Sequence, residues 1–470
     1  MVMGSLSQET EVVVIGAGPG GYVAALHAAD LGKEVMLIEE RPRLGGVCLI
    51  EGCIPSKTLI HAVELKHQAE VASKMGLSFS DVKVDPAGLL KWKETVVDGL
   101  TKGIASLMKN RGVEVIKGRA RFTDKNTLAL EGADVSSIKF KHCILATGSR
   151  VARLPMAEGL PVWTSKEALD IPTVPPRLLV IGGGYIGLEL GFVYAGLGSR
   201  VTVVEVLDQL LTGCDPDLSQ PVLKSAQKKF EAVMLGTKVT GLKHDGKLFH
   251  VNVEAGGASK TLEFEQVFMA VGRKPNTEDI GLATTGIAVD KGGFIATDAQ
   301  KRTSVPHIYA IGDITHGPML AHKASREGKV AAEVIAGHNA AFDNIAIPAV
   351  VFTDPEVAWV GLTETEAKQA NRTVNVASFP AMALGRAKTL GVTDGKAKLI
   401  SDPETGLILG AGIVGPHASD LIAEAALALE MGATLEDLAI TIHPHPTLSE
   451  LLMESAEVAL GHGVHVPKKK

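Results

Sequence analysis

The chain has 470 residues, of which 46% are hydrophobic and 21% charged, and its formal net charge is −6. This length is too great for one hydrophobic core, so we expect several domains. The negative charge gives no electrostatic basis for binding nucleic acid, and four cysteines in so long a chain exclude a disulfide-rich secreted scaffold.

The first elements predict a dinucleotide site. A β-branched strand, 12–15, runs directly into glycines 16, 18 and 21, and a helix then leads to the strand 35–38. Such glycines form a tight turn that lets the backbone approach a pyrophosphate at a helix N-terminus. Glu39, 18 positions after Gly21, is placed to accept hydrogen bonds from a ribose. One such motif alone is weak evidence.

Residues 12–29 also have about the length of a membrane span and contain no Lys, Arg, Asp or Glu. Pro19 and its neighbouring glycines lie at the centre of this stretch, which favours a strand, a turn and a buried helix. The N-terminus shows no basic segment followed by an apolar core and a small-residue cleavage site. We therefore predict a cytoplasmic protein that does not enter the membrane.

Two cysteines, Cys48 and Cys53, lie in the next segment, 45–57. A bridge closing so short a loop constrains the unfolded chain little, which favours a redox role over a structural one. Residues i and i+5 rise ~7.5 Å along a straight helix, whereas a disulfide needs Cα atoms roughly 4.4–6.8 Å apart. The pairing therefore requires an irregular turn, which Gly52 permits. The alternative is two unpaired thiols in a core.

The dinucleotide signature occurs a second time. The strand 178–181 precedes glycines 182, 184 and 187, and a helix leads to the strand 201–204 and Glu205, again 18 positions after the third glycine. Two copies are strong evidence, and they suggest that electrons pass from one cofactor to another. A carboxylate at the ribose suits the free 2′-hydroxyl of NAD and repels the 2′-phosphate of NADP.

Two later segments, 140–148 and 303–313, are predicted strands that end in glycine turns and return to the first site. Asp313 could accept a hydrogen bond from a ribityl chain, or cap the helix that follows. Near the C-terminus, 447–450 reads as a capping box in which Glu450 caps a helix and His445 is a loop residue. We divide the chain into four parts: 1–149, 150–275, 276–347 and 348–470.

Together these motifs resemble those of the class I pyridine nucleotide-disulfide oxidoreductases, and most closely the members that oxidise dihydrolipoamide. The resemblance runs from end to end and rests on both glycine motifs and on 45–57, 146–148, 271–276, 310–313 and 443–450. It implies an α/β fold with two Rossmann-like dinucleotide-binding domains and a C-terminal α+β dimerisation domain. It also implies FAD and NAD, no metal, a homodimer, and a lipoyl-bearing domain of a 2-oxo acid dehydrogenase acyltransferase or glycine cleavage protein as partner.

The resemblance implies roles for individual residues. Cys53 would face the flavin and Cys48 would exchange with the substrate, while His445, oriented by Glu450, would be the base supplied by the second subunit. His443 would be a bystander. The remaining cofactor contacts would come from Lys57 paired with Glu189, from Ala120, Thr147, Gly148, Asp313 and Ala321 at the FAD, and from Tyr185, Val239, Ala270, Gly272 and Arg273 at the NAD.

Between the cysteines the family commonly has Asn-Val, where this chain has Ile50 and Glu51. A carboxylate pointing at the cysteines would disfavour a thiolate, so we expect Glu51 to face solvent. Three alternatives stay open: another disulfide reductase, a flavoprotein NADH oxidase or diaphorase with idle thiols, and a non-catalytic nucleotide-binding protein. A mercuric reductase would need a C-terminal cysteine pair that 466–470 lacks, and Glu205 opposes an NADP-linked glutathione-type enzyme.

Overall fold

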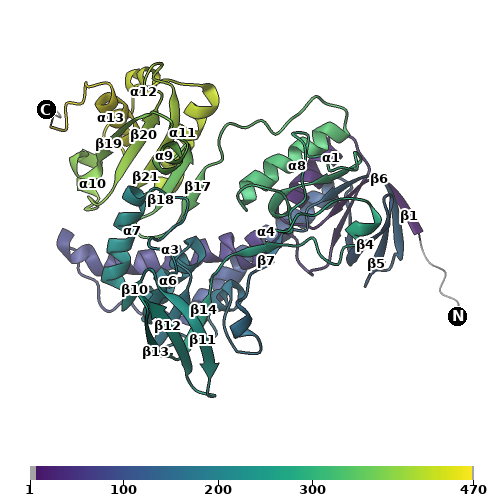
Figure 1. Ribbon diagram of the computed structural model, residues 1–470, viewed down its shortest axis with the longest axis horizontal. Coiled ribbons are helices and arrows are strands. Elements are labelled where there is room, and N and C mark those ends of the chain that lie inside the picture. Colours follow the sequence, from purple (N-terminus) through teal and green to yellow (C-terminus); the bar gives the residue numbers. More distant parts are fainter. Residues whose placement is uncertain (1–6, 468–470) are drawn as a thin grey trace.

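The computed structural model describes residues 7–467 (Figure 1). Its first domain is built on a seven-stranded sheet in the order β3-β2-β1-β6-β5-β4, with β16 also paired to β6. The strands are β1 (Ser7–Ile15), β2 (Val35–Glu39), β3 (Glu114–Lys117), β4 (Arg119–Asp124), β5 (Thr127–Glu131), β6 (Ser137–Leu145) and β16 (Ile308–Ala310). Because β16 pairs in parallel with β6, the chain returns to the first sheet after completing a second domain.

Helices α1 (Pro19–Asp30) and α8 (Ala321–Ile335) pack on each other against this sheet. Glycines allow the close approach, since a Cβ on Gly328 would lie 2.6 Å from the carbonyl oxygen of Gly20. Near the start of α8 the hydroxyl of Ser325 donates to the carbonyl oxygen of Pro19, the first residue of α1, at 3.3 Å. Both helices begin after the carboxyl ends of parallel strands, β1 and β16, where open α/β sheets bind ligands.

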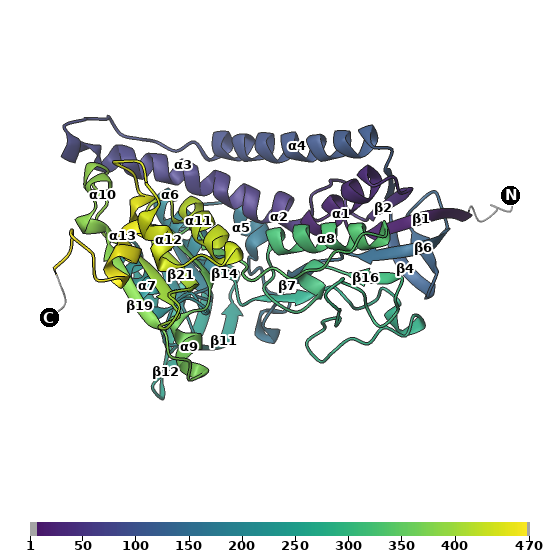
Figure 2. The ribbon, with the colours of Figure 1, turned by 90° about the horizontal axis from the view of Figure 1, so that it is seen from above.

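A helical arm follows β2. It consists of α2 (Gly46–Glu51), α3 (Cys53–Val71), the 3₁₀ turn η1 (Ala72–Met75) and α4 (Pro86–Asn110), and Figure 2 shows α3 and α4 extending along one side of the molecule. The segment Gly46–Met75 has the length and apolar composition of a membrane span. Its first turns line the cavity described below, and Pro55, Ser56 and Leu59 of α3 are buried against the rest of the protein.

The second domain has a parallel sheet in the order β10-β9-β8-β14. Its strands are β8 (Arg177–Ile181), β9 (Arg200–Val204), β10 (Ala232–Met234) and β14 (Gln266–Met269), and its helices are α5 (Ser165–Leu169), α6 (Tyr185–Leu197) and α7 (Pro216–Lys229). An antiparallel sheet of β11 (Lys238–His244), β12 (Phe249–Ala255) and β13 (Ala258–Phe264) lies beside it. The short strands β7 (Ser149–Val151) and β15 (Arg273–Pro275) pair where the chain enters and leaves this domain.

Between β15 and α8 the chain forms the 3₁₀ turns η3 (Leu282–Thr284) and η4 (Gly312–Ile314), and a third, η2 (Pro155–Ala157), follows β7. The last domain has an antiparallel sheet in the order β17-β18-β21-β20-β19. Its elements are β17 (Ala349–Val351), β18 (Val357–Gly361), α9 (Glu364–Gln369), β19 (Asn375–Pro380), η5 (Ala381–Ala383), α10 (Gly385–Thr389), β20 (Lys396–Ser401), β21 (Ile408–Val414), α11 (Ala418–Met431), α12 (Leu435–Ile440) and α13 (Glu450–Ala459).

The predicted fold class is confirmed: one domain has a mainly parallel sheet in which β4 and β5 are antiparallel, the second has a parallel sheet, and an α+β domain follows. The reason is visible in the strands: all five residues of β2 are buried, as are four of five in β8 and in β9. Strands buried on both faces read as continuous apolar runs rather than as alternating ones.

Candidate active site

The first glycine motif forms a turn that no other residue type would fit. Gly16 has a φ of +100°, and a Cβ there would lie 2.4 Å from the carbonyl oxygen of Ala146, directly after the neighbouring strand β6. A Cβ on Gly21 would lie 1.8 Å from the oxygen of Gly16. Gly18 caps α1, and the backbone of Gly46 approaches it so closely that a Cβ on Gly46 would meet its Cα at 2.5 Å. The redox segment therefore begins directly against the phosphate-binding turn.

The second motif repeats this geometry. Gly182 has a φ of +112°, and a Cβ there would lie 2.4 Å from the oxygen of Ala270. A Cβ on Gly187 would lie 2.1 Å from the oxygen of Gly182, and Gly184 caps α6. Gly272 lies in the loop between β14 and β15, two residues after Ala270, and has a φ of +115°. The two glycine motifs therefore have the same backbone geometry.

The acidic residues that follow the two motifs, Glu39 and Glu205, also occupy equivalent positions. Glu39 ends β2 and accepts a hydrogen bond from the N–H of Ala17 at 2.8 Å. Glu205 follows β9 and accepts from the N–H groups of Gly183 at 2.6 Å and Leu207 at 2.9 Å. Each carboxylate is thus fixed beside its glycine turn, at the position where a ribose would lie.

A cavity of about 570 Å³ opens from the first glycine motif toward the second domain. Most of the predicted FAD-site residues line it, together with both cysteines: Gly16, Gly18, Glu39, Cys48, Cys53, Lys57, Ala120, Thr147, Gly148, Glu189, Asp313 and Ala321. Tyr185 and Arg273, which we expected at the NAD, line the same cavity. Val239, which we expected at the NAD, has its side chain in the hydrophobic core of the second domain with 6% exposure. Any contact of Val239 with a nucleotide would therefore be made by its backbone.

The helix that carries the cysteines is broken between them. Gly52 separates α2 from α3 with φ −145° and ψ −113°, and a Cβ there would lie 3.0 Å from the carbonyl oxygen of Val47. Both cysteines are thiols in this structure, and they hydrogen-bond to each other. The bend therefore brings together two side chains that a straight helix would separate.

The two thiols differ in acidity. The hydrogen bond to Cys53, and then burial, raise the pKa of Cys48. For Cys53 the hydrogen bond from Cys48 comes first, burial opposes it, and the positive charge of Lys57 adds to it, so that the pKa falls to about 7. Cys53 is therefore the thiol that ionises more readily, and only a thiolate reacts as a nucleophile or electron donor.

Asp313 is held by Ser149, and Ser149 in turn is held by Arg273. The hydroxyl of Ser149 donates to the Asp313 carboxylate and accepts from Nε of Arg273 at 2.7 Å, and Arg273 also donates to the carbonyl oxygen of Ser149 at 2.7 Å. Ser149 was not predicted as a site residue. Its place directly after the turn 146–148 was the available signal.

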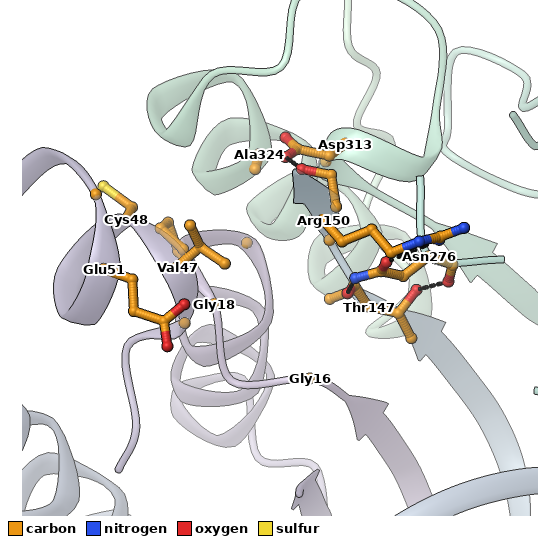
Figure 3. Close-up of a pocket in the computed structure, with 18 of the residues that line it drawn as sticks. Gly16, Gly18, Val47, Cys48, Glu51, Thr147, Arg150, Asn276, Asp313 and Ala324 are labelled. Carbon is orange, nitrogen blue, oxygen red and sulfur yellow. Dashed lines mark hydrogen bonds between the residues drawn. The ribbon is translucent and has the colours of Figure 1, made fainter. Parts of the chain in front are cut away.

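Asn276 is the second residue that was missed, and Figure 3 shows it facing Thr147 across the cavity wall. The hydroxyl of Thr147 donates to the carbonyl oxygen of Asn276 at 2.7 Å, and the Asn276 amide donates back to the Thr147 carbonyl at 3.0 Å. These bonds tie the end of β6 to the segment leaving the second domain. The motif 271–276 pointed to this region, but a pairing across 129 residues has no local signature.

The expectation that Glu51 faces solvent is wrong. Its side chain is 22% exposed and lines the cavity (Figure 3). The carboxylate lies 3.3 Å from Nη1 of Arg41 and 3.6 Å from Nζ of Lys166. The carboxylate is therefore paired with two cations, one from the first domain and one from the second.

His445 and Glu450 lie together on the last domain. Nδ1 of His445 is 2.9 Å from Oε1 of Glu450, while Oε2 of Glu450 accepts from the N–H of Thr447 at 2.8 Å. One oxygen thus holds the imidazole and the other holds the backbone just before α13. The predicted capping box does not form: Glu450 is the first residue of α13, the N-cap is Ser449 without a side-chain cap, and the Thr447 hydroxyl bonds to Pro444 and Ser449 instead. The His445 side chain is 76% exposed, and in the described chain neither residue lines the cavity. The peptide bond between His445 and Pro446 is cis.

Comparisons with known proteins agree with this arrangement. A family described as pyridine nucleotide-disulphide oxidoreductase matches residues 10–328, and the dimerisation domain of that family matches 347–456. The dihydrolipoyl dehydrogenases of Geobacillus stearothermophilus and Haloferax volcanii are each 48% identical to this chain, over 100% and 99% of both sequences respectively. That of Bacillus subtilis is 46% identical over 100% of both.

Two solved structures have the same architecture. LpdA from Mycobacterium tuberculosis aligns with a TM-score of 0.88 at 27% identity, covering 96% of this chain and 99% of its own. The HOCl-induced flavoprotein disulfide reductase RclA from Escherichia coli aligns with a TM-score of 0.85 at 26% identity, covering 95% and 99%. By its full-length relatives and its matched domains, this chain belongs to the pyridine nucleotide-disulphide oxidoreductase family.

Proposed function

We propose that this protein oxidises protein-bound dihydrolipoamide to lipoamide with NAD⁺ as the final acceptor. The observation that carries the proposal is the position of Cys48 and Cys53, on the wall of the cavity that the first glycine motif opens. A thiol pair placed there can couple a dinucleotide cofactor to a dithiol substrate. The relatives named dihydrolipoyl dehydrogenase, which match over the full length, support the choice of dithiol.

The cavity residues fit FAD. The turn at Gly16 and Gly18 and the N-terminus of α1 are suited to a pyrophosphate, and Glu39 to a ribose. Asp313 and the backbone of η4 face the same space, where a ribityl chain would pass. FAD bound there would accept an electron pair from the Cys53 thiolate and deliver it as hydride to NAD⁺.

The protein residues would handle the sulfur and proton chemistry. With Cys48 and Cys53 oxidised to a disulfide, His445 of the second subunit takes a proton from one substrate thiol, and the resulting thiolate attacks the Cys48 sulfur. A mixed disulfide forms and Cys53 leaves as a thiolate. The second substrate thiol then attacks its own disulfide-bound sulfur, which releases cyclic lipoamide and Cys48 as a thiol. The substrate loses two electrons and the cysteine pair gains them.

A homodimer is what completes this site. The region 347–456 matches a dimerisation domain, and His445 lies on that domain, away from the cavity of its own subunit. Exposed apolar side chains lie on the helices before His445 and on the loop that carries it: Leu427, Met431, Ile440 and Ile442. Burying them against a second copy would bring His445 toward the partner's cysteines.

The substrate arm would be the lipoyl-bearing domain of a 2-oxo acid dehydrogenase acyltransferase or of a glycine cleavage protein. NAD is favoured over NADP because Glu205 is held beside the second glycine turn and would repel a 2′-phosphate. The cytoplasmic location stays a prediction.

A diaphorase with idle thiols is the alternative from a different class, and anaerobic reduction separates the two. An active Cys53 predicts a long-wavelength thiolate–flavin absorption band after two electrons, and its absence would favour the diaphorase. The steady-state test compares NAD-linked oxidation of dihydrolipoamide with NADPH-linked reduction of glutathione, and we expect only the first.

His445→Gln tests the base. We expect dihydrolipoamide oxidation to fall by roughly 10²–10⁴-fold, while electron transfer from NADH to an artificial acceptor is retained. His462→Gln is the matched control, since His462 is also an exposed C-terminal histidine, 3.9 Å from a carboxylate, Glu457. Near-normal turnover by His445→Gln would remove His445 from the mechanism.

A further inference from the structure

Glu327, on α8, is a charged residue with no exposed surface. Its carboxylate oxygen Oε2 accepts the backbone N–H of Gly312 at 2.7 Å. Gly312 begins the 3₁₀ turn η4, and both Gly312 and the next residue, Asp313, line the cavity. Glu327 therefore holds a piece of the cavity wall from inside the protein.

Two lysines complete a buried cluster around this carboxylate. Oε1 of Glu327 lies 2.9 Å from Nζ of Lys301 and 3.0 Å from Nζ of Lys323, whose side chains are 10% and 3% exposed. The Lys323 ammonium also donates to the carbonyl oxygen of Gly312 at 3.3 Å and to the hydroxyl of Thr315 at 3.1 Å. That hydroxyl donates to the same Gly312 carbonyl at 2.8 Å. The cluster therefore binds both the N–H and the carbonyl of Gly312.

Lys301 reaches the cluster from a strained backbone. Its φ is +66°, in the left-handed region that favours glycine, and its ammonium lies 4.4 Å from the centre of the Phe342 ring. Strained residues gather at functional sites, and replacing buried ion pairs by apolar side chains is often neutral or stabilising. Stability alone therefore does not account for three buried charges at this place.

The cluster connects two parts of the proposed FAD site. Gly328, next to Glu327, packs so closely on α1 that a Cβ there would lie 2.6 Å from the carbonyl oxygen of Gly20. This contact holds α8 against the helix that follows the first glycine turn. Glu327 then ties η4 to α8, while Ser149 of β7 holds the Asp313 carboxylate. The position of Asp313 relative to the glycine turn therefore depends on Glu327.

We propose that Glu327 is a positioning residue that sets the distance between the first glycine turn and the Asp313 carboxylate, so that the site holds the flavin half of FAD. Without this acceptor the N–H of Gly312 would lose its partner and η4 would shift. The adenosine half would be held by Glu39 and the glycine turn, which belong to other elements. This inference rests on the proposed FAD site.

The test is ligand binding to the full-length chain freed of FAD, with FAD and ADP as probes. ADP has the adenosine and the diphosphate of FAD but neither its ribityl chain nor its flavin ring. In Glu327→Met we expect the Kd for FAD to rise by about 10–100-fold, as for a lost hydrogen bond to a charged group, and the Kd for ADP to change by less than about twofold. Lys329→Met, at an exposed lysine on the same helix, is the matched control and should leave both values in place.

Two further variants separate positioning from stability. The triple variant Lys301→Met, Lys323→Met and Glu327→Met leaves none of these charges buried alone, so the FAD-free chain should keep its Tm while its Kd for FAD still rises. A purely structural role predicts that the Tm and both affinities fall together. In Glu327→Gln the side-chain oxygen can still accept the N–H of Gly312, so this variant should bind FAD more tightly than Glu327→Met.

The outcomes also distinguish this inference from the proposed function. A wild-type chain that does not bind FAD contradicts the proposed function. If the wild type binds FAD, an unchanged Kd for FAD in Glu327→Met, or equal losses for FAD and ADP, overturns the role of Glu327 and leaves the function standing. If Glu327→Met does not fold, the two affinities of the triple variant and of Glu327→Gln decide in the same way.

Discussion

The ammonium of Lys57 lies 2.7 Å from Oε2 of Glu189, and this ion pair joins all three domains. Lys57 comes from α3 and Glu189 from α6, while Oε1 of Glu189 accepts the backbone N–H of Phe352, directly after β17, at 3.0 Å. The Lys57 ammonium also lies 4.6 Å from the centre of the Phe352 ring. The charge one turn beyond Cys53 is thus held by contacts from the two other domains.

Replacing Lys57 by methionine should raise the pKa of Cys53. The hydrogen bond from Cys48 and then the charge of Lys57 lower that pKa to about 7, against the effect of burial. In reduced wild-type protein the alkylation rate of Cys53 should therefore rise with pH around a midpoint near 7. In Lys57→Met the midpoint should move to higher pH, with less thiolate at neutral pH. Lys66→Met, which breaks an exposed ion pair on the same helix, should leave it in place, and an unchanged Lys57→Met midpoint would contradict the assignment.

Replacing Glu51 by valine should lower the thiol pKa and ease reduction of the cysteine pair. The reason is that Arg41 and Lys166 would lose their shared carboxylate and present uncompensated positive charge to the thiolate. Equilibration with a dithiol couple of known potential measures the change. The control is Glu64→Val, an exposed position on α3. A potential and pH profile equal to those of the wild type would show that Glu51 does not act on the pair.

Replacing Glu205 by alanine should weaken the preference for NAD. The carboxylate is fixed by the N–H groups of Gly183 and Leu207, so its removal takes away a ribose acceptor and the repulsion of a 2′-phosphate. We expect the ratio of kcat/KM for NAD to that for NADP to fall by about 10–100-fold, as for one or two charged hydrogen bonds. Asp208→Ala, at the nearby exposed acid, should keep the wild-type ratio.

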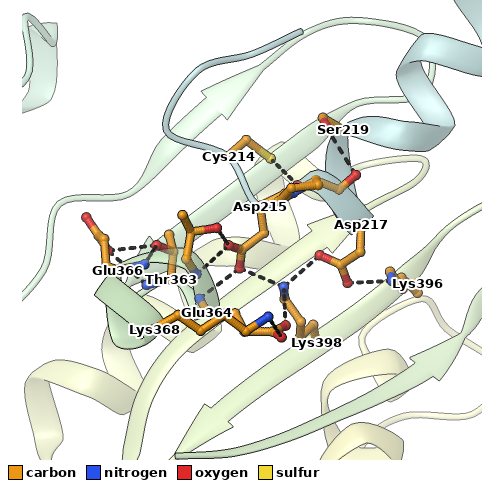
Figure 4. Close-up of polar contacts among 12 residues, drawn as sticks. Cys214, Asp215, Asp217, Ser219, Thr363, Glu364, Glu366, Lys368, Lys396 and Lys398 are labelled. Atoms are coloured by element: carbon orange, nitrogen blue, oxygen red, sulfur yellow. Dashed lines mark hydrogen bonds and ion pairs between the residues drawn. The ribbon is translucent and has the colours of Figure 1, made fainter. Parts of the chain in front are cut away.

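Lys398 joins the second domain to the last one (Figure 4). Its ammonium, on a side chain only 2% exposed, lies 2.6 Å from Asp215 and 2.7 Å from Asp217. Asp215 also accepts the N–H groups of Glu364 and Thr365 at the start of α9. Asp215, Asp217 and Glu364 cluster closely enough to suggest a cation site, and the Lys398 ammonium supplies the positive charge there.

Lys398→Met should destabilise the fold by about 3–5 kcal/mol, because it leaves the buried carboxylate of Asp215 without its cation. Thermal unfolding should show a lower Tm, whereas Lys368→Met, at a 74% exposed lysine, should change it little. An equal Tm for the two variants would mean that the network adds nothing to stability.

The same network predicts an acid transition. Burial opposes the ionisation of Asp215, but hydrogen bonds from Lys398, Thr365 and the start of α9 lower its pKa to about 2. A folded-state pKa below the unfolded value contributes stability above about pH 4, and that contribution is lost as the pH falls toward 2. In Lys398→Met the loss should begin at higher pH, which equilibrium unfolding measured between pH 5 and 2 would detect.

Local pattern was sufficient for the repeated part of this protein. Both glycine turns, the acid 18 positions beyond each, and the buried strands around them follow from sequence, because these constraints act between residues close along the chain. A positive φ at Gly16 and a helix break at Gly52 are requirements of the backbone that glycine alone satisfies easily. The spacing of the cysteines likewise required the bend that separates α2 from α3.

Contacts between distant segments were decided only by the tertiary structure. The sequence could not show that Glu51 pairs with Lys166, that Ser149 links Arg273 to Asp313, or that His443 is held by Glu424. Each of these depends on how domains or helices pack, and the charge that a side chain experiences depends on neighbours that no local spacing specifies. Residue identity therefore determined which chemistry is possible, and packing determined the protonation state and the partner of each group.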